Sequence, residues 1–379
     1  MEAQRQHLID AVRAAAADVR LLRLRGGGSK DFWGAPLSGE VLDTRGYRGI
    51  VSHEPSELFV TARCGTPLAE LEAALAAHGQ CLPFEPPHFG AGATVGGMVA
   101  AGLSGPARAS VGSVRDYVLG VRMVNGRGED LTFGGQVMKN VAGYDVSRLL
   151  AGSWGTLGLI TEVSLKVLPV APAEATLMCV GLDQATALNL LHRWGGQPLP
   201  LNASAWVRDT TATPVADFLF VRLRGAVAAV QSATTRMSAD ASALGAQVTV
   251  MDNAAAGADW RASGEQTLPF FQAPSADQAL WRLSVPQTAP VIELPCLSAA
   301  AQYIEWQGAQ RWLWAPMDAA PAIHAAAQLV GGSAQCLRSV GPRNGSVFAP
   351  MPEALLRIQR ALQEQFDPQG VFATGRMGH

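Results

Sequence analysis

Apolar and polar side chains alternate along the segment GLITEVSLKVLPV, which starts at Gly158. Alternation with a period of two predicts a β-strand with one buried face. We expect this strand to stop at Pro169, and the residues VAPAEA that follow are typical of a linker. The side chains on its buried face would be Leu159, Thr161, Val163, Leu165 and Val167.

Two other stretches have the spacing of amphipathic helices. The first starts at Pro67 with Thr66 as its expected N-cap, and Gly79 ends it. The second starts at Pro352 and ends at Asp367. The apolar stripe of the first helix is Leu68, Leu71 and Leu75, and that of the second is Leu355, Ile358, Leu362 and Phe366.

The segment DYVLGVRMV predicts a strand that runs into a turn at Asn125 and Gly126. Short strands and helices therefore alternate in the first half of the chain, without regular βαβ repeats. Glycine is concentrated in the same half, since 25 of the 40 glycines lie between Gly26 and Gly158. Tryptophan, in contrast, is concentrated in the second half. The two halves are expected to be built differently, with a domain boundary after the strand that ends at Pro169.

Composition excludes several classes of protein. Hydrophobic residues make up 48% of the 379 residues and charged residues 16%, with a formal net charge of −2, which indicates a globular chain rather than a disordered or nucleic-acid-binding one. No apolar run reaches the ~18 residues of a membrane span, and arginines interrupt the N-terminal segment where a signal peptide needs its apolar core. We therefore expect a cytoplasmic protein. The five cysteines lack the spacing of a metal or iron–sulfur site.

Four glycine clusters dominate the first half: RGGGSK, GAGATVGGMVAAGLSGP, VGSVRD and GSWGTLG. Successive glycines allow neighbouring backbone N–H groups to surround an anion, so together the clusters predict a cradle for a dinucleotide diphosphate. A helix beginning after Thr94 would add the positive end of its dipole. Neither familiar phosphate motif fits. Val95 occupies the third glycine position of a Rossmann fingerprint, and Ser29 precedes Lys30, the reverse of a P-loop.

These clusters, together with VMKNVAGYDVSRLLAGSWGTLGLITEVSLKVLP and the terminal FDPQGVFATGRM, resemble the FAD-binding E subunit of bacterial glycolate dehydrogenase. That family belongs to the flavoproteins of the vanillyl-alcohol oxidase and p-cresol methylhydroxylase (PCMH) type. The resemblance runs in order from about Arg25 to Pro169 and returns near Phe366. It is weak between Ala171 and Val340.

The resemblance implies an α+β fold. A PCMH-type FAD-binding domain of two α+β subdomains would span residues 1–170, and an α+β cap domain of the FAD-linked oxidase C-terminal type would span residues 171–340. Residues 341–379 would form a helix and a tail that returns to the FAD domain. In that tail, Ala373 and Thr374 stand where the family usually has Asn-Pro, and Arg376 is a candidate to approach the flavin.

The resemblance also assigns the cofactor site. FAD would be bound non-covalently, because members that attach it covalently often carry histidine at the position of Ser29. Lysine usage adds modest support, since only three of the 29 cations are lysines and two, Lys30 and Lys139, lie in matched motifs. The implied FAD-binding residues are Gly26, Gly27, Gly28, Ser29, Lys30, Thr94, Val95, Gly96, Gly97, Gly112, Ser113, Asp116, Gly155, Gly158 and Ile160.

Three functions remain open from the sequence. The chain could contribute to oxidation of glycolate, or of D-lactate, to the 2-oxo acid only within a complex with the homologous FAD-binding D subunit and the iron–sulfur F subunit, with contact to the inner membrane through these partners. It could be a self-sufficient FAD-dependent 2-hydroxy-acid dehydrogenase. It could also be a structural or electron-relay subunit. The H-x-G-D-G-N motif expected in the D subunit and in D-lactate dehydrogenases is absent, and His192 and His324 are isolated, so no catalytic base is assigned.

Overall fold

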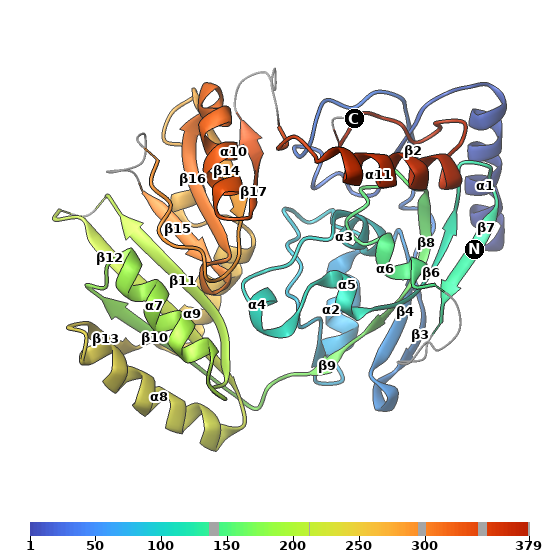
Figure 1. Ribbon diagram of the computed structural model, residues 1–379. Coiled ribbons are helices and arrows are strands. Elements are labelled where there is room, and N and C mark those ends of the chain that lie inside the picture. The colour runs from blue at the N-terminus through green and yellow to red at the C-terminus, as the bar shows by residue number, and fades with distance from the viewer. Residues whose placement is uncertain (136–143, 212, 295–300, 340–346, 378–379) are drawn as a thin grey trace. The chain divides into compact units, whose positions relative to one another are not determined.

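The computed structural model describes residues 1–135, 144–211, 213–294, 301–339 and 347–377. The chain folds into two compact units (Figure 1). The first comprises residues 1–104, 113–170 and 350–379, and the second comprises residues 105–112 and 171–349. The segment predicted as one domain, 1–170, is thus interrupted by residues 105–112, and the C-terminal segment from Pro350 groups with the first unit.

The first unit is built on a five-stranded sheet of order β3-β4-β8-β6-β7, in which all neighbouring strands are antiparallel. The central strand β8 is the one that alternation predicted, and it is buried along most of its length. It contributes Leu159 to one hydrophobic cluster and Ile160, Val163 and Leu165 to another. The strands are β3 (Ile50–Glu54), β4 (Phe59–Arg63), β6 (Val118–Val124), β7 (Asp130–Gly134) and β8 (Leu159–Lys166).

Two short strand pairs and several helices complete this unit. The pair β1–β2 is parallel and β5–β9 is antiparallel. Their bounds are β1 (Leu22–Arg25), β2 (Glu40–Asp43), β5 (Gln80–Cys81) and β9 (Leu168–Pro169). The helices are α1 (Glu2–Ala17), α2 (Leu68–Ala76), α3 (Val95–Ala101), α5 (Val114–Tyr117), α6 (Val146–Leu149) and α11 (Glu353–Phe366).

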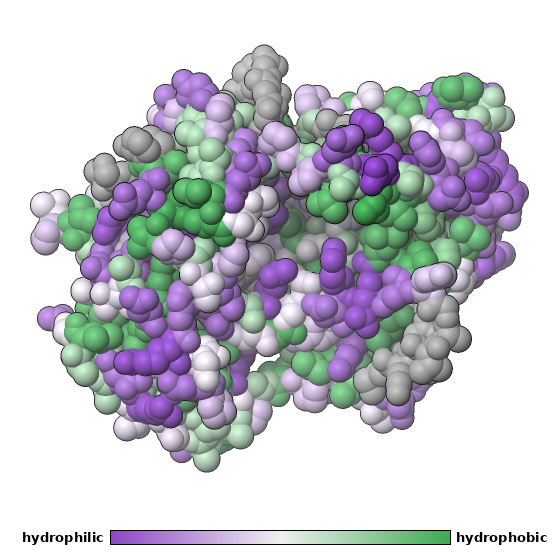
Figure 2. Space-filling view, viewed as in Figure 1, coloured by the Kyte–Doolittle hydropathy of each residue, from purple (hydrophilic) through white to green (hydrophobic). Residues whose placement is uncertain are grey.

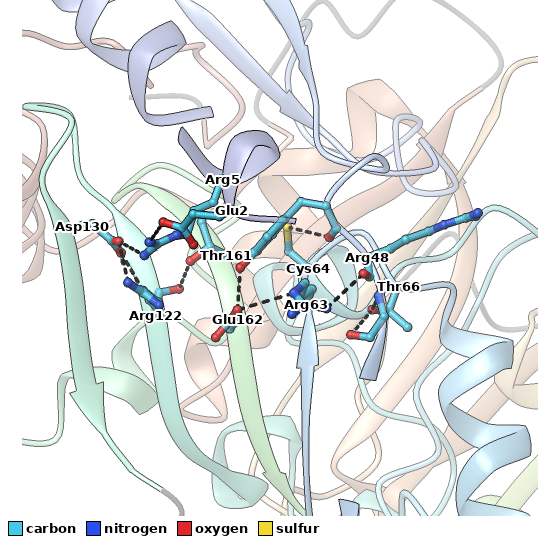
Figure 3. Close-up of polar contacts among 12 residues, drawn as sticks. Glu2, Arg5, Arg48, Arg63, Cys64, Thr66, Arg122, Asp130, Thr161 and Glu162 are labelled. Carbon is cyan, nitrogen blue, oxygen red and sulfur yellow. Dashed lines mark hydrogen bonds and ion pairs between the residues drawn. The ribbon is translucent and has the colours of Figure 1, made fainter. Parts of the chain in front are cut away.

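Ion pairs attach α1 to the edge of the five-stranded sheet. Asp130 of β7 pairs with Arg122 of the neighbouring strand β6 at 2.8 Å and also with Arg5 of α1 (Figure 3). The apolar residues Leu8, Ile9, Val12 and Ala15 of α1 pack into a cluster that includes Val371 and Phe372 from the C-terminal tail. Its outer side is largely hydrophilic in the space-filling view (Figure 2). The N-terminal helix is therefore an integral part of the first unit.

Two of the predicted helices are present with altered ends or burial. Helix α2 carries the expected apolar stripe, but its N-cap is Pro67, because the hydroxyl of Thr66 instead accepts a hydrogen bond from the Gly49 N–H at 2.9 Å. Helix α11 has its predicted bounds, whereas Leu355 and Ile358 are 54% and 56% exposed rather than buried. No helix in the described part of the chain is both long and apolar enough to cross a membrane.

The second unit contains an eight-stranded sheet made of two similar halves. The first half follows the order β-α-β-β-α-β, with its strands arranged β13-β10-β12-β11, which is a ferredoxin-like arrangement. The second half repeats that arrangement in mirror order, β15-β16-β14-β17, and the halves join through the antiparallel pair β11–β15. The first half has helix α7 between its first two strands, β10 and β11, whereas the described residues between β14 and β15 contain no helix.

Helices α7 and α8 pack on one face of the first half, and α10 packs on the second half. Helix α9 follows the first half and donates a hydrogen bond from its Trp260 to Thr176 of β10. The strands are β10 (Ala173–Val180), β11 (Leu201–Asp209), β12 (Ala216–Gly225), β13 (Gln247–Val250), β14 (Gln278–Ser284), β15 (Gln302–Glu305), β16 (Gln310–Pro316) and β17 (Ser333–Ser339). The helices are α4 (Arg108–Val111), α7 (Gln184–Gly195), α8 (Val227–Ser242), α9 (Asn253–Gly264) and α10 (Ala320–Leu329).

Candidate functional site

A cavity in the first unit lies where three of the glycine-rich loops meet. Its walls come from the loop after β1, from the start of α3, from the loop before β8 and from the C-terminal tail. The cavity measures about 110 Å³, which is room for a diphosphate group rather than for a whole dinucleotide. It is therefore a candidate for the anion-binding part of a larger binding surface.

Two of the loops touch backbone to backbone, and this contact explains the glycines. A Cβ atom at Gly27 would lie 1.5 Å from the carbonyl oxygen of Gly92, and one at Gly26 would lie 2.3 Å from the hydroxyl oxygen of Thr94. Only glycine permits both approaches, because any other residue would overlap the facing loop. The glycines thus hold the loop after β1 against the loop that leads into α3.

The first loop also presents unused hydrogen-bond donors. The backbone N–H groups of Gly27, Gly28 and Ser29 find no acceptor among the described residues, although all three residues line the cavity. Gly28 has a positive φ of 73°, the left-handed conformation that turns successive N–H groups toward one point. Unpaired donors of this kind are costly unless an anion or water receives them. The loop is consequently suited to bind phosphate oxygens.

Charge on the cavity wall supports the same ligand chemistry. Among its described lining residues, Arg25, Lys30 and Arg376 are cations and Asp31 is the single carboxylate, which leaves an excess of two positive charges. The Arg25 guanidinium and the Asp31 carboxylate form an ion pair at 2.6 Å. The ammonium of Lys30 is 5.5 Å from the ring centroid of Phe89 and donates to the His88 carbonyl at 3.2 Å. A diphosphate would balance this charge.

The loop at the start of α3 contributes less than its sequence suggests. The N–H of Gly96 donates to the Cys64 carbonyl at 2.8 Å, and that of Gly97 donates to the Thr94 hydroxyl at 3.3 Å. The N–H of Val95 is likewise used by Thr66. The helix predicted to begin after Thr94 is present as α3, but its first N–H groups bond within the protein.

Gly96, one of the residues implied to contact FAD, packs against Cys64. A Cβ at Gly96 would lie 2.5 Å from the Cβ of Cys64. Cys64 is buried, and burial raises the pKa of its thiol to about 12, so it stays protonated at neutral pH. Gly96 is thus required for close packing, while a Cβ at Gly97 would meet a single neighbouring atom, the Thr94 hydroxyl oxygen at 3.1 Å.

The remaining wall joins the C-terminal tail to two tryptophans. The indole rings of Trp33 and Trp154 stack at 3.8 Å, and the Arg376 guanidinium lies 5.2 Å from the ring centroid of Trp154. Backbone hydrogen bonds hold the tail in place, including Ala35 N–H to the Arg376 carbonyl at 3.0 Å. Asp367 accepts the N–H groups of Val371 and Phe372 and fixes the bend that starts the tail.

The structure brings together many of the residues expected to contact FAD, but not all of them. Val95 is buried in the hydrophobic core, and Ser113 and Asp116 form the capping box of α5. Gly112 groups with the second unit, and Lys139 lies outside the described residues. The predicted residues that line the cavity are Gly26, Gly27, Gly28, Ser29, Lys30, Thr94, Gly96, Gly97, Gly155, Gly158 and Ile160.

Several lining residues escaped the assignment from sequence. Arg25 and Trp154 lie inside matched glycine motifs, so their position in those motifs was an available signal. Ala100, on α3, likewise lies inside a matched glycine cluster. Nothing in the local sequence marks Thr44 or Cys64, which reach the cavity from the ends of β2 and β4. Arg376, the candidate from the C-terminal tail, also lines the cavity. The lining residues that were not predicted are Leu24, Arg25, Asp31, Thr44, Cys64, Ala100, Trp154 and Leu159.

His192 and His324, the two histidines considered as catalytic bases, contact an aromatic ring or a backbone carbonyl of the second unit. His324 is 6% exposed and meets the Trp281 ring edge-on, with the ring centroids 5.6 Å apart. The ring of His192 bonds to the Gln287 carbonyl. Neither contact supplies a carboxylate that would orient the imidazole as a general base. The catalytic base remains unassigned in this chain.

Comparison with known proteins decides the family. A family model described as an FAD binding domain matches residues 3–145. The glycolate oxidase subunit GlcE of Escherichia coli strain K12 is 43% identical over 373 residues, which cover 98% of this chain and 97% of that protein. The chain belongs to the GlcE family. The predicted family is therefore confirmed.

More distant relatives match less than half of the chain. The D-lactate dehydrogenase of Archaeoglobus fulgidus is 36% identical over 47% of this chain and 40% of that protein. The glycolate oxidase subunit GlcD of Bacillus subtilis is 32% identical over 38% of this chain and 30% of that protein. Among solved structures, an alkyldihydroxyacetonephosphate synthase superposes with a TM-score of 0.70 at 16% identity, over 97% of this chain and 73% of that one. The predicted PCMH-type α+β fold is confirmed.

Proposed function

We propose that this GlcE-family chain is the FAD-carrying subunit of a multi-subunit 2-hydroxy-acid dehydrogenase that oxidises glycolate to glyoxylate. Three features support the proposal: relatedness to GlcE along nearly the whole chain, the FAD binding domain match, and a cavity with unused N–H donors and excess positive charge. The cavity carries the most weight, because it gives the glycines a chemical purpose that turn formation alone would not.

The diphosphate of FAD would lie against Gly27, Gly28 and Ser29, with Lys30 and Arg376 as neighbouring cations. Backbone N–H groups and positive side chains are the partners that phosphate oxygens take in proteins. When bound, FAD supplies the acceptor for a hydride from the substrate carbon that carries the hydroxyl group. The adenine, ribityl and flavin-ring contacts assigned to Gly112, Ser113, Asp116, Gly155, Gly158 and Ile160 stay predictions from the family resemblance.

Non-covalent attachment of FAD is part of the proposal. Ser29 occupies the position where covalent members carry histidine, and an alcohol is a poor nucleophile without an activating base. Cys64 also lines the cavity, but burial raises the pKa of its thiol to about 12, so the reactive thiolate is scarce. Neither side chain is suited to form a bond to the flavin.

A complex is the proposed working form. The chain carries no H-x-G-D-G-N motif and no closely spaced cysteines for an iron–sulfur cluster. We therefore propose that the homologous FAD-binding D subunit takes part in oxidation of the substrate. The iron–sulfur F subunit would accept the electrons from the flavin. The cytoplasmic location, with contact to the membrane through these partners, stays a prediction from the sequence.

Reconstitution tests this proposal. The tagged chain would be purified alone, with either partner and with both partners, and each preparation would be assayed for flavin content and glycolate-dependent reduction of a dye. We expect flavin in the single chain and rapid turnover only with partners. Turnover by the chain alone would instead support a self-sufficient dehydrogenase. A folded chain without flavin that still joins the complex would support a structural role.

A further inference from the structure

The second unit contains a cavity of about 850 Å³, considerably larger than the one in the first unit. It lies on the face of the eight-stranded sheet opposite α7 and α8. Along β12, Leu219 and Val221 pack into the core beneath those helices, while the alternating Phe218 and Phe220 line the cavity. Helix α9 and residues 268–274 contribute further walls.

The aromatic lining presents carbon surface because its polar atoms are used inside the protein. The Tyr303 hydroxyl donates to Ser263 Oγ at 2.9 Å, and Trp260 Nε1 donates to Thr176 Oγ1 at 3.0 Å. Trp314 Nε1 donates to the Phe270 carbonyl at 2.7 Å. Because these donors already have acceptors inside the protein, the rings need no hydrogen-bond acceptor from a ligand. They favour an apolar occupant.

Two partly exposed aromatic side chains stand next to each other on one wall of the cavity. The rings of Phe218 and Phe220 are tilted by only 14° relative to each other, with centroids 6.0 Å apart along β12. Their side chains are partly exposed, so they can receive a ring laid against them. Offset stacking on such a surface gives about 0.5–1.5 kcal/mol per aromatic pair beyond the burial of apolar area. These exposed rings therefore favour a ligand that carries a planar aromatic ring of its own.

Charge at the cavity disfavours an anion. Its described lining contains two carboxylates, Asp209 and Asp259, and one guanidinium, that of Arg208. Asp217 neutralises Arg208 through two hydrogen bonds of 2.9 and 3.0 Å. A fatty acid or a 2-hydroxy acid would therefore meet like charge and no available cation among these residues. The volume also lies in the range of drug-sized ligands, ~300–1,000 Å³, far above that of glycolate.

We propose that this cavity is a binding site for a neutral, planar ring compound with a mostly apolar surface. The site is formed by residues of the second unit and goes beyond the proposed function, since it requires neither FAD nor the 2-hydroxy acid. Its selectivity rests on the exposed rings of Phe218 and Phe220, on aromatic side chains whose polar atoms are satisfied, and on the pairing of the lining guanidinium of Arg208 with Asp217.

The neutral planar dye Nile red tests the site in the purified full-length chain with any flavin it carries. Dye fluorescence would be excited at wavelengths longer than flavin absorption and followed to saturation. We expect one saturable site. Phe220→Asp places a charge in the wall and should raise the dissociation constant at least about tenfold, a cost of ~1.4 kcal/mol. Val215→Asp adds the same charge at a position that is 54% exposed and outside the lining, and should leave binding unchanged.

A second pair of variants covers the case in which Phe220→Asp does not fold. Ala273 is exposed at the rim and lines the cavity, whereas Ala276 is exposed in the same loop outside the lining. Ala273→Trp should fill the entrance and weaken Nile red binding at least about tenfold, and Ala276→Trp should not. Absence of saturable binding to the parent chain, or equal binding by the members of a folded pair, would overturn the proposal.

Discussion

The Arg376 guanidinium lies over the indole of Trp154, with 5.2 Å between its Cζ atom and the ring centroid. The same guanidinium donates a hydrogen bond to the Lys30 carbonyl at 3.3 Å, and its side chain is almost fully buried at the cavity wall. Stacking and hydrogen bonding therefore hold a cation of the C-terminal tail beside the loop proposed to bind diphosphate.

Arg376→Ala should weaken FAD binding by roughly tenfold to a hundredfold. It removes a positive charge next to the diphosphate, and a hydrogen bond to a charged group contributes about 1.5–3 kcal/mol. Flavin fluorescence quenching during titration of the apoprotein measures the change. Arg357→Ala, an exposed position on α11, is the matched control and should bind FAD like the parent. Equal affinities in the two variants would remove Arg376 from the site.

Gly27→Ala should destabilise the loop contact and lower the flavin content of the purified protein. A Cβ atom there would lie 1.5 Å from the Gly92 carbonyl oxygen, so one of the two loops has to move. We expect a loss of about 3 kcal/mol in the free energy of unfolding, in the range of steric overpacking. Thermal unfolding with and without added FAD measures it. Gly46→Ala, where the nearest atom would be 3.6 Å away, should unfold like the parent.

Gly97→Asp should abolish FAD retention while the protein stays folded. The Cβ at this position meets only the Thr94 hydroxyl at 3.1 Å, so the carboxylate can extend into the cavity and repel the diphosphate. Flavin absorbance per chain and circular dichroism check both parts of the expectation. Gly46→Asp carries the same charge outside the cavity lining and should retain flavin. A flavin-loaded Gly97→Asp protein would show that the diphosphate lies elsewhere.

Acid precipitation should release all the flavin into the supernatant. Ser29 offers no nucleophile comparable to the histidine of covalent members, and Cys64 is a protonated, buried thiol. Absorbance of the supernatant and in-gel fluorescence of the pellet measure the distribution. A fluorescent protein band in the denaturing gel would demonstrate a covalent bond and contradict the proposal.

Cys64 should make folding less favourable at high pH. Its folded-state pKa is raised from 9.0 to about 12 by burial, so the protonated thiol stabilises the fold fully below pH 9. That contribution is lost between pH 9 and about 12, at up to ~1.4 kcal/mol per pH unit. Urea unfolding at pH 8 and pH 10 should therefore show a smaller decline for Cys64→Ala than for the parent. An equal decline in both proteins would assign the pH dependence to other groups, such as Cys179 and Tyr47, whose pKa values are also raised.

The periodicity of apolar residues predicted the elements whose pattern and ends are set by residues close together in the sequence. Helix α11 has the expected bounds, because its pattern and its proline boundary are local properties of the sequence. Strand β8 begins at Leu159 as expected but ends at Lys166, and the expected end at Pro169 belongs to the separate strand β9, which pairs with β5. The capping role of Thr66 was wrong, since its hydroxyl is used by Gly49 on a neighbouring segment. The exposure of Leu355 and Ile358 likewise could not be read from a pattern that reports only which side of a helix is apolar.

The glycine clusters predicted a cradle but not the use of each glycine. Gly27 and Gly96 both allow close approach, yet their partners, Gly92 and Cys64, are set by how distant loops meet. The N–H groups at the start of α3 looked available in sequence and are used inside the protein. The second cavity had no sequence signal, because its aromatic residues come from three strands, from α9 and from the segment around Phe270.

The position of the tail sets an order for cofactor capture during protein synthesis. Arg376 bonds to a residue 346 positions earlier in the chain, and the Val371 carbonyl accepts the N–H of Leu22 at 2.7 Å. The ribosome makes the glycine-rich loop first and must then make the entire second unit before the tail emerges. Domains commonly begin to fold during synthesis, but this cavity wall is completed only afterwards. A nascent chain that ends before residue 371 should therefore hold FAD weakly, even when its first sheet has already formed.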